Sequence, residues 1–183
     1  MFILYAVVIG IALGLLFGGD LARLGELKLR FAWVCVLGLA VQLVLFSDPV
    51  TERIGSLGVP IYVVSTVAVA VAVAANYRIQ GMAVVALGAF CNLAAIAANG
   101  GYMPTTAEAM AATGFSEKTV YSNSALLSDP NLPWLIDRFA MPTWIPSHNV
   151  FSIGDVLIGL GVAIVIVVAM RRPTARVSGA PAH

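Results

Sequence analysis

Long apolar stretches separated by short polar ones dominate the chain. Five stretches are almost continuously apolar, at residues 1–17, 31–46, 59–75, 82–98 and 150–170. Each approaches the roughly 20 helical residues that cross about 30 Å of hydrocarbon. Because apolar and polar residues do not alternate within them, helices are favoured over the strands of a membrane barrel. The pattern therefore predicts an all-α fold, a polytopic membrane helix bundle of five transmembrane helices.

The fourth and fifth stretches are joined by residues 99–149, predicted to be one long extracytoplasmic loop containing short helices. Within it, "TTAEAMAATG" offers a capping box, Thr105 with Glu108, and a helix stop at Gly114. Further on, "NLPWLIDRFAMPTWIP" mixes aromatic residues with prolines, which favours a short helix lying in the headgroup layer. We expect this loop to form a structured lid over the outer helix ends.

Composition agrees with a membrane location. The 183 residues are 60% hydrophobic and 10% charged, and the mean hydropathy is +0.95, whereas soluble domains average about 25% charged residues. A net charge of +1 offers no basic surface for nucleic acid. Residues 1–170 are interpreted as a single transmembrane bundle, and residues 171–183 as a disordered cytoplasmic tail. The first apolar stretch has no preceding Lys or Arg, so it is interpreted as a retained span rather than a signal peptide.

Lys and Arg are divided unevenly between the two sides of this predicted bundle. One side carries Arg23, Lys28, Arg30, Arg78, Arg171, Arg172 and Arg176, and the other carries Arg53, Lys118 and Arg138. Cytoplasmic loops of membrane proteins are enriched in Lys and Arg. The distribution therefore predicts an N-terminus outside and a C-terminus in the cytoplasm.

Asp155 is the only charged residue inside the apolar stretches. A carboxylate at mid-membrane costs about 2.5 to 3.5 kcal/mol on insertion scales, so its presence calls for an explanation. Counted from Val150 at 1.5 Å per residue, it lies roughly 8 Å below the helix start, with Ser147 or Asn149 expected as the N-cap. Two interpretations stay open: a tolerated carboxylate near a helix N-terminus, or the centre of a site.

Helical spacing places further polar residues on the face of Asp155. Counting back gives Ser152 and His148, and counting forward gives Gly159 and Ala163. This face is polar near the surface and small further in, which is typical of a helix that lines a cavity.

The fourth stretch carries a matching set of polar residues. Asn92 and Asn99 are seven residues apart on one helix face, and Tyr102 follows in "NGGYMP". If the fourth and fifth helices pack together, these residues would meet Ser152 and Asp155 in the outer leaflet. Such a site would bind a lipid headgroup, a cation, a proton or another small ligand. The alternative for Asn92 is a single interhelical hydrogen bond.

Other chemistry-bearing motifs are absent from the sequence. It contains no G-x-S-x-G, H-E-x-x-H or P-loop. Cys35 and Cys91 fall inside apolar stretches without metal-ligand spacing, and His148 has no second His or Cys beside it. No metal and no cofactor are therefore predicted, and a non-enzymatic role is favoured.

Glycine recurs every four residues in the first stretch, at Gly10, Gly14 and Gly18. This doubled G-x-x-x-G forms a smooth face that another helix can approach closely. Packing within the chain is favoured. The alternative is association with a second copy or another protein, which would make the chain an accessory or scaffold subunit. The spacing leaves the oligomeric state open.

Three segments together resemble a known family: "GGDLARLGELKLR", "NGGYMP" and "NVFSIGDVLIGLG". They are similar to a family of small bacterial integral membrane proteins that is catalogued as a domain of unknown function. The closing NVFSxGDxxI segment is the most specific part, and the resemblance covers most of the chain. It implies a multi-pass protein of the bacterial cytoplasmic membrane and implies no activity.

The segment "NVFSIGD" is also similar, more weakly, to the F-N-x-A-D segment of lipoprotein signal peptidases. That segment carries a catalytic aspartate at the outer start of the last span. The similarity implies Asp155 as one catalytic carboxylate and Asp137, in "LIDRF", as its partner. Two such acids sharing a proton activate water for peptide cleavage. The asparagine here precedes the aspartate by six residues instead of three, so the likeness is one of polarity and position.

Overall fold

The chain is mostly helical in a computed structural model that describes residues 2–114, 124–146 and 148–171. Its five long helices are α1 (Phe2–Leu16), α2 (Ala32–Leu45), α4 (Gly58–Ala74), α5 (Met82–Ala98) and α7 (Ile153–Arg171). They match the five predicted apolar stretches to within three residues at each end. The prediction of five long helices is therefore confirmed, and the predicted tail beyond residue 171 lies outside the described residues.

Three short helical segments were not predicted as separate elements. They are the 3₁₀ helices η1 (Leu21–Glu26) and η2 (Gly55–Leu57), and the helix α3 (Asp48–Ile54). Asp20 starts η1 by accepting a hydrogen bond from the Ala22 backbone N–H, 2.9 Å away. A proline near the first helical position starts α3, as the missing N–H of proline permits.

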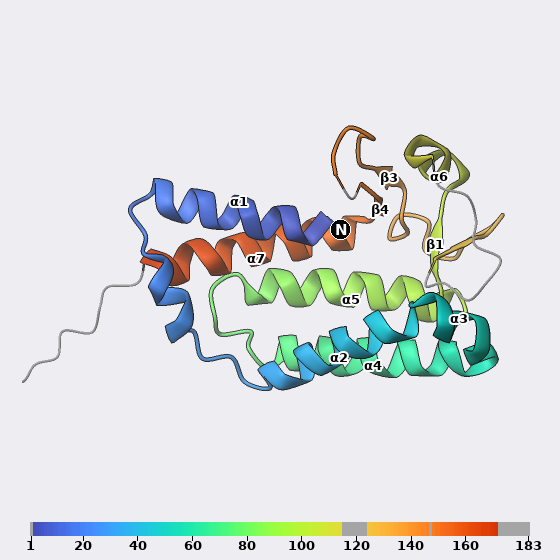
Figure 1. Cartoon of the computed structure of the whole chain (residues 1–183), viewed down its shortest axis with the longest axis horizontal. Coiled ribbons are helices and arrows are strands. Elements are labelled where there is room, and N and C mark those ends of the chain that lie inside the picture. Colours follow the sequence, from blue (N-terminus) through green and yellow to red (C-terminus); the bar gives the residue numbers. More distant parts are fainter. Residues whose placement is uncertain (1, 115–123, 147, 172–183) are drawn as a thin grey trace, which may run out of the picture.

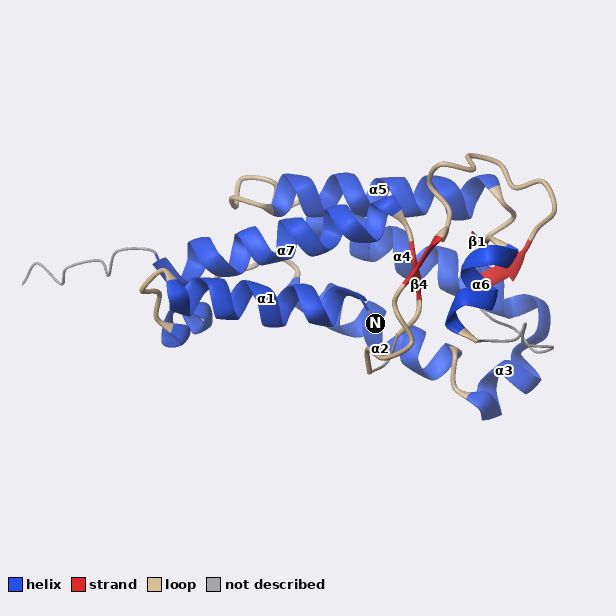
Figure 2. Cartoon of the chain, turned by 90° about the horizontal axis from the view of Figure 1, so that it is seen from above, coloured by secondary structure: helices blue, strands red, loops and turns tan. Residues whose placement is uncertain are grey.

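The long helices form a bundle in which neighbours in space are not always neighbours in sequence (Figures 1 and 2). The packing order is α1, α7, α5, α4 and α2, so α7, the last helix of the chain, lies between α1 and α5. Figure 1 shows η1 and the α4–α5 turn at one end of the bundle, called the turn end here. The opposite end carries α3 and the segment between α5 and α7, and it is called the cap end.

Two helical segments among the described residues are long and apolar enough to cross a membrane. They are Pro49–Ala74, which joins α3, η2 and α4, and Ile153–Arg171. The other three, α1, α2 and α5, are equally apolar but only 15, 14 and 17 residues long. Helix length thus supports two spans, and it does not establish the predicted five.

The cap, the described part of residues 99–152, is a folded element (Figure 1). Strand β1 (Met103–Thr105) pairs in parallel with β2 (Ser124–Leu126), and β3 (Phe139–Ala140) pairs antiparallel with β4 (Val150–Phe151). The predicted short helix is present as α6 (Ala107–Thr113). The cap therefore contains one short helix and two small sheets.

Two local predictions within the cap are wrong. The N-cap of α6 is Thr106, whose hydroxyl accepts from the Ala109 N–H at 3.1 Å, and not Thr105, which belongs to β1. Gly114 does end this helix, with a left-handed φ of 69°. The proline-bracketed segment 131–146 forms turns and strand β3 instead of an interfacial helix. Its prolines lack backbone donors and disfavour helical conformation at the residues before them.

The glycines of α1 face α7 within the same chain. A Cβ on Gly10 would meet the Ala163 Cα at 3.0 Å, and one on Gly14 would overlap the Met170 side chain. Gly18 lies beyond the end of α1 and has a positive φ of 73°. The close approach therefore uses Gly10 and Gly14, while Gly18 turns the chain away from the helix.

Candidate functional site

A reciprocal pair of hydrogen bonds fixes the start of α7. The Ser152 hydroxyl accepts from the Asp155 N–H at 3.0 Å, and the Asp155 Oδ2 atom accepts from the Ser152 N–H at 3.1 Å. This is a capping box, with an aspartate as the acidic partner. Asp155 consequently lies in the first turn of the helix, where the helix dipole favours an anion.

Both the predicted helix start and the predicted N-cap need correction. Val150 and Phe151 are extended because they pair with β3, so the helix cannot begin before Ser152. Asn149 precedes this strand and is not the N-cap, and Ser147 lies outside the described residues. The carboxylate is therefore nearer the end of the helix than counting from Val150 implied.

Asn92 of α5 completes a three-residue network with this capping box. Its Nδ2 donates to Asp155 Oδ1 at 2.8 Å, and its Oδ1 accepts from the Ser152 hydroxyl at 2.8 Å. Ser152 is fully buried. The network requires α5 and α7 to cross closely, which they do at Gly88 and Gly154. The sequence left open whether these two helices pack together, and the structure brings Asn92 to Ser152 and Asp155.

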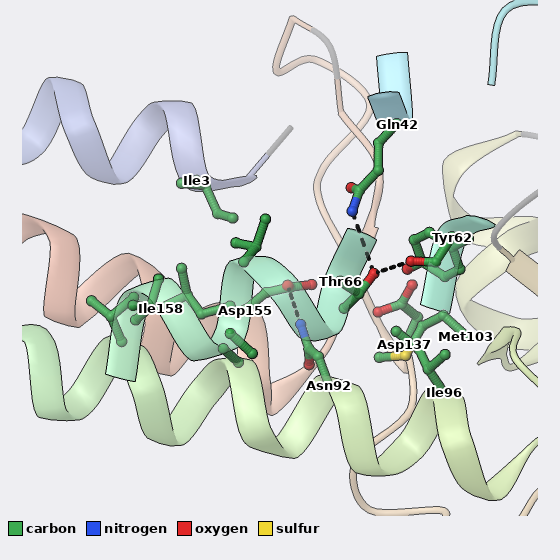
Figure 3. A pocket seen from close by; sticks show the side chains of 15 residues that line it. Ile3, Gln42, Tyr62, Thr66, Asn92, Ile96, Met103, Asp137, Asp155 and Ile158 are labelled. Atoms are coloured by element: carbon green, nitrogen blue, oxygen red, sulfur yellow. Dashed lines mark hydrogen bonds between the residues drawn. The ribbon is translucent and has the colours of Figure 1, made fainter. Parts of the chain in front are cut away.

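Asp155 also borders a cavity of about 310 Å³ between the helices and the cap (Figure 3). Its polar lining comes from four helices and the cap: Gln42, Tyr62, Thr66, Asn92, Asp137 and Asp155. The remaining lining is apolar and includes Ile3, Ile96, Met103 and Ile158. No Lys, Arg or His lines this cavity within the described part of the chain.

Asp137 reaches the cavity because its backbone is joined to β1. Its N–H donates to the Pro104 carbonyl at 2.9 Å, and its carbonyl accepts from the Thr106 N–H at 3.1 Å. The side chain is 8% exposed, and its buried Oδ1 has no hydrogen-bond partner among the described residues. Burial, and next the charge of Asp155, raise the pKa of Asp137 to about 7.

Four residues of the predicted site do not line this cavity. One of them, Ser152, is joined to the lining residues Asn92 and Asp155 by hydrogen bonds, and the other three lie apart from it. Asn99 joins α5 to the cap, because its Nδ2 donates to the Ala95 and Asn131 carbonyls at 2.7 and 2.9 Å. The His148 ring nitrogens contact the Ile145 and Thr113 carbonyls at 3.2 and 3.1 Å. Neither these two residues nor the half-buried Tyr102 lines the cavity.

His148 lies off the predicted polar face for a simple geometric reason. Counting residues in steps of three and four assumes a helix, but His148 precedes the β4 strand. The helical rule therefore fails on the N-terminal side of Ser152.

Gln42 and Thr66 belong to the cavity although the sequence pattern did not select them for the site. Gln42 Nε2 donates to the Ser65 and Thr66 hydroxyls, both at 3.3 Å. Thr66 in turn donates to the Tyr62 carbonyl at 2.8 Å. The available signal was a polar residue inside an apolar stretch, but such residues also form ordinary interhelical hydrogen bonds.

A second cavity, of about 320 Å³, meets Asp155 from the side of α1 and α2. It is lined by Phe2, Ile3, Leu4, Leu39, Asn149 and Asp155. The buried Oδ1 of Asn149 has no hydrogen-bond partner among the described residues. Asp155 thus lies between two cavities, one internal and one bordered by apolar side chains of α1 and α2.

The described residues contain no cluster of three or more His, Cys, Asp or Glu that could hold a metal ion. Cys35 and Cys91 are free thiols on different helices. The chemistry available in the internal cavity is that of two carboxyl groups: attraction of a cation, exchange of a proton, or polarisation of a water molecule. Fold and site together define a mostly helical protein with an acidic cavity beneath a folded cap.

The chain belongs to a protein family of unknown function, DUF5317, whose model matches residues 26–167. The matched range contains Gln42, Asn92, Asp137 and Asp155, so it covers all the acidic and amide residues of the internal cavity. No curated protein and no solved structure matches the chain. Its activity has to be argued from its own residues.

Proposed function

We propose that the chain is a multi-pass protein of the bacterial cytoplasmic membrane in which all five long helices cross the bilayer. Large apolar side chains are 53% to 67% exposed on each of them, for example Val8, Leu43, Val64, Phe90 and Leu160. Soluble monomers rarely expose contiguous apolar surface on this scale. The shorter helices would be accommodated by local thinning of the bilayer, at a modest cost.

Charge supports placing the turn end in the cytoplasm. Among the described residues, Arg23, Lys28, Arg30, Arg78 and Arg171 belong to the segments at that end (Figure 1). Within the same described residues, the α3 and cap segments contribute Arg53 and Arg138, while Lys118 lies outside those residues. By the positive-inside rule the cap and the N-terminus face outward.

Within this membrane protein, the internal cavity would bind a small ligand that carries a positive charge or several N–H donors. The observation that carries the proposal is the buried Oδ1 atom of the Asp137 carboxyl group, which has no hydrogen-bond partner among the described residues. Burying such a group without compensation costs about 1 to 3 kcal/mol or more. A cation or amine between Asp137 and Asp155 would supply the missing partner and reduce the repulsion of the two carboxylates.

A thermal-shift titration of the purified chain in detergent tests this proposal. Sodium, potassium and ethylammonium chloride would be added at constant ionic strength, with bulky tetrabutylammonium as the size control. At least one small cation should raise the midpoint temperature of the wild-type chain. The increase should grow between pH 6 and pH 8, because the Asp137 carboxyl group ionises near pH 7.

Variants decide whether the effect arises in the cavity. Asp137→Asn should abolish the cation-dependent increase, whereas Glu108→Gln, which removes an exposed carboxylate on α6, should keep it. A cation effect of equal size in Asp137→Asn would overturn the proposal, as would the absence of any effect in the wild type. Asp155→Asn should also abolish the effect while leaving membrane insertion intact.

An aspartate-pair hydrolase is the second candidate. It is favoured by one observation: Asp137 and Asp155 line the same cavity, and the charge of Asp155 contributes to the raised pKa of Asp137. One protonated and one ionised carboxyl group could activate water. However, both Asp155 oxygens already accept hydrogen bonds from Asn92 and Ser152, and no hydrogen bond links the two carboxyl groups among the described residues. These contacts favour a binding role.

The two candidates differ in what they require of the two acids. A hydrolase needs both carboxyl groups, so Asp137→Asn and Asp155→Asn should each abolish cleavage of a membrane-embedded peptide substrate. Cleavage that survives either substitution would rule out the hydrolase. The third role considered from the sequence, an accessory subunit associating through the glycine face of α1, has less support because α7 already covers that face.

A further inference from the structure

A third cavity, called the basic cavity here, lies at the turn end, on the side of the molecule away from the cap. It has a volume of about 470 Å³ and forms where the segment entering α2 meets the turn between α4 and α5. Three cationic residues line it: Lys28, Arg30 and Arg78. No Asp or Glu lines it within the described part of the chain, so its charge is uniformly positive.

Asn76 holds the two segments of this cavity together. Its Oδ1 accepts from the Arg30 N–H at 2.8 Å, and its Nδ2 donates to the Arg30 carbonyl at 2.9 Å and to the Ala72 carbonyl at 2.7 Å. Asn76 is 6% exposed. One buried side chain therefore fixes both backbone polar groups of Arg30 against the α4–α5 turn.

Aromatic rings position the two arginine side chains. The Arg30 guanidinium lies 5.7 Å from the centre of the Phe31 ring, and that of Arg78 lies 5.6 Å from the centre of the Tyr77 ring. Arg78 Nε also donates to the Tyr77 hydroxyl at 3.1 Å. None of Lys28, Arg30 and Arg78 forms an ion pair within the described residues. The three exposed cationic side chains thus line one cavity, and no carboxylate among the described residues neutralises them.

Three like charges around one cavity repel each other unless an anion lies among them. Arginine presents a planar set of N–H donors that matches phosphate oxygens, and lysine adds a compact charge. At the same end, Phe31 and Tyr77 are exposed aromatics that suit the boundary between headgroups and hydrocarbon. Basic pockets beside membrane helices on the cytoplasmic side are typical sites for anionic lipid headgroups.

We propose that this cavity binds the phosphate group of an anionic phospholipid of the cytoplasmic leaflet, with Lys28, Arg30 and Arg78 as its ligands. The phosphate chemistry follows from the cavity alone. The choice of a lipid as its source rests on the membrane placement proposed above. The site is separate from the acidic cavity, so either can fail without the other.

Lipid binding by the full chain in detergent micelles tests this proposal, with native mass spectrometry measuring bound phosphatidylglycerol and phosphatidylcholine. The wild type should bind phosphatidylglycerol at least tenfold more tightly. Arg30→Gln combined with Arg78→Gln should abolish that preference. Arg53→Gln combined with Arg138→Gln removes the same charge at the cap end and should preserve it. Lys28→Gln, which leaves both aromatic-braced arginines in place, should weaken binding three- to tenfold.

Inorganic phosphate distinguishes the two sources of the same chemistry. If the natural ligand is a lipid, 10 mM phosphate should not displace phosphatidylglycerol. Binding of inorganic phosphate without a preference for the anionic lipid would overturn the lipid assignment. Equal affinity of the wild type for both lipids, together with no phosphate binding, would overturn the site itself. A preference that persists in the Arg30 and Arg78 double variant would also overturn it.

Discussion

Replacing Gly154 with Ala should disrupt the contact between α5 and α7 at the acidic site. A Cβ at this position would lie 1.9 Å from the Asn92 Oδ1 atom and 2.8 Å from the Gly88 carbonyl oxygen. The Asn92 side chain can rotate away only by giving up its bonds to Asp155 and Ser152. Gly88 belongs to a helix backbone and can yield only if the two helices separate.

The typical energies of overpacking, hydrogen bonding and helix propensity decide the expected sign of this change. Overpacking a close contact costs about 1 to 3 kcal/mol, and each lost hydrogen bond costs about 0.5 to 1.5 kcal/mol. Alanine gains at most about 1 kcal/mol over glycine from helix propensity, and less in a first turn. With two hydrogen bonds lost, Gly154→Ala should lower the free energy of unfolding by about 1 to 5 kcal/mol.

Denaturant unfolding in mild detergent, followed by circular dichroism, measures this change. Gly25→Ala is the matched control, because nothing lies within 4 Å of its added Cβ, and it should alter stability by less than about 0.5 kcal/mol. In an Asn92→Ala background the cost of Gly154→Ala should shrink, since the nearest clashing atoms are gone. A Gly154→Ala chain as stable as the wild type, or strictly additive costs in the double variant, would refute the packing argument.

Three further outcomes can be checked with the same unfolding assay. Ser152→Ala removes both the N-cap and the donor to Asn92, so it should lower the free energy of unfolding by about 2 to 4 kcal/mol; a loss below about 0.5 kcal/mol would contradict the buried network. The folded-state pKa of Asp137, about 7, lies above its ordinary 3.8, so the folded chain binds more protons between these values. Stability should therefore fall as pH rises from about 4 to about 7. Asp137→Asn should flatten that slope, and an unchanged slope would show that other groups cause it. Asn76→Ala should destabilise the chain by about 1 to 3 kcal/mol and accelerate amide hydrogen exchange at Arg30, whereas unchanged exchange there would exclude the proposed clamp.

The hydrophobic pattern predicted the five long helices directly, but it predicted their end residues only in part. Continuous apolar stretches located all five long helices, because side-chain hydrophobicity is readable residue by residue. The start of α7 was placed too early, since Val150 and Phe151 are extended only through pairing with Ala140 and Phe139. Strand partners ten and twelve residues away leave no trace in the hydrophobic pattern of either segment.

The residues of the candidate site were also predicted only in part from the sequence. Helical spacing correctly associated Ser152 with Asp155, and it made Asn92 a candidate partner only if α5 and α7 packed together. Spacing also selected His148, which lies outside the helix, and Asn99, whose amide is committed to the cap.

The sequence by itself determined the apolar helices, the uneven distribution of Lys and Arg among the segments that connect them, and the polar positions Asn92, Ser152 and Asp155 within the apolar stretches. These features depend on neighbours within a turn or two, so composition and periodicity express them. The tertiary structure alone decided that Asp137 enters the internal cavity beside Asp155. It also decided that Arg30 and Arg78 line one cavity at the turn end. Both arrangements depend on hydrogen bonds between segments more than 30 residues apart. The Asp137 N–H donates to the Pro104 carbonyl, and the Asn76 side chain accepts from the Arg30 N–H. Many segments offer such donors and acceptors, and only the packed fold selects which of them pair.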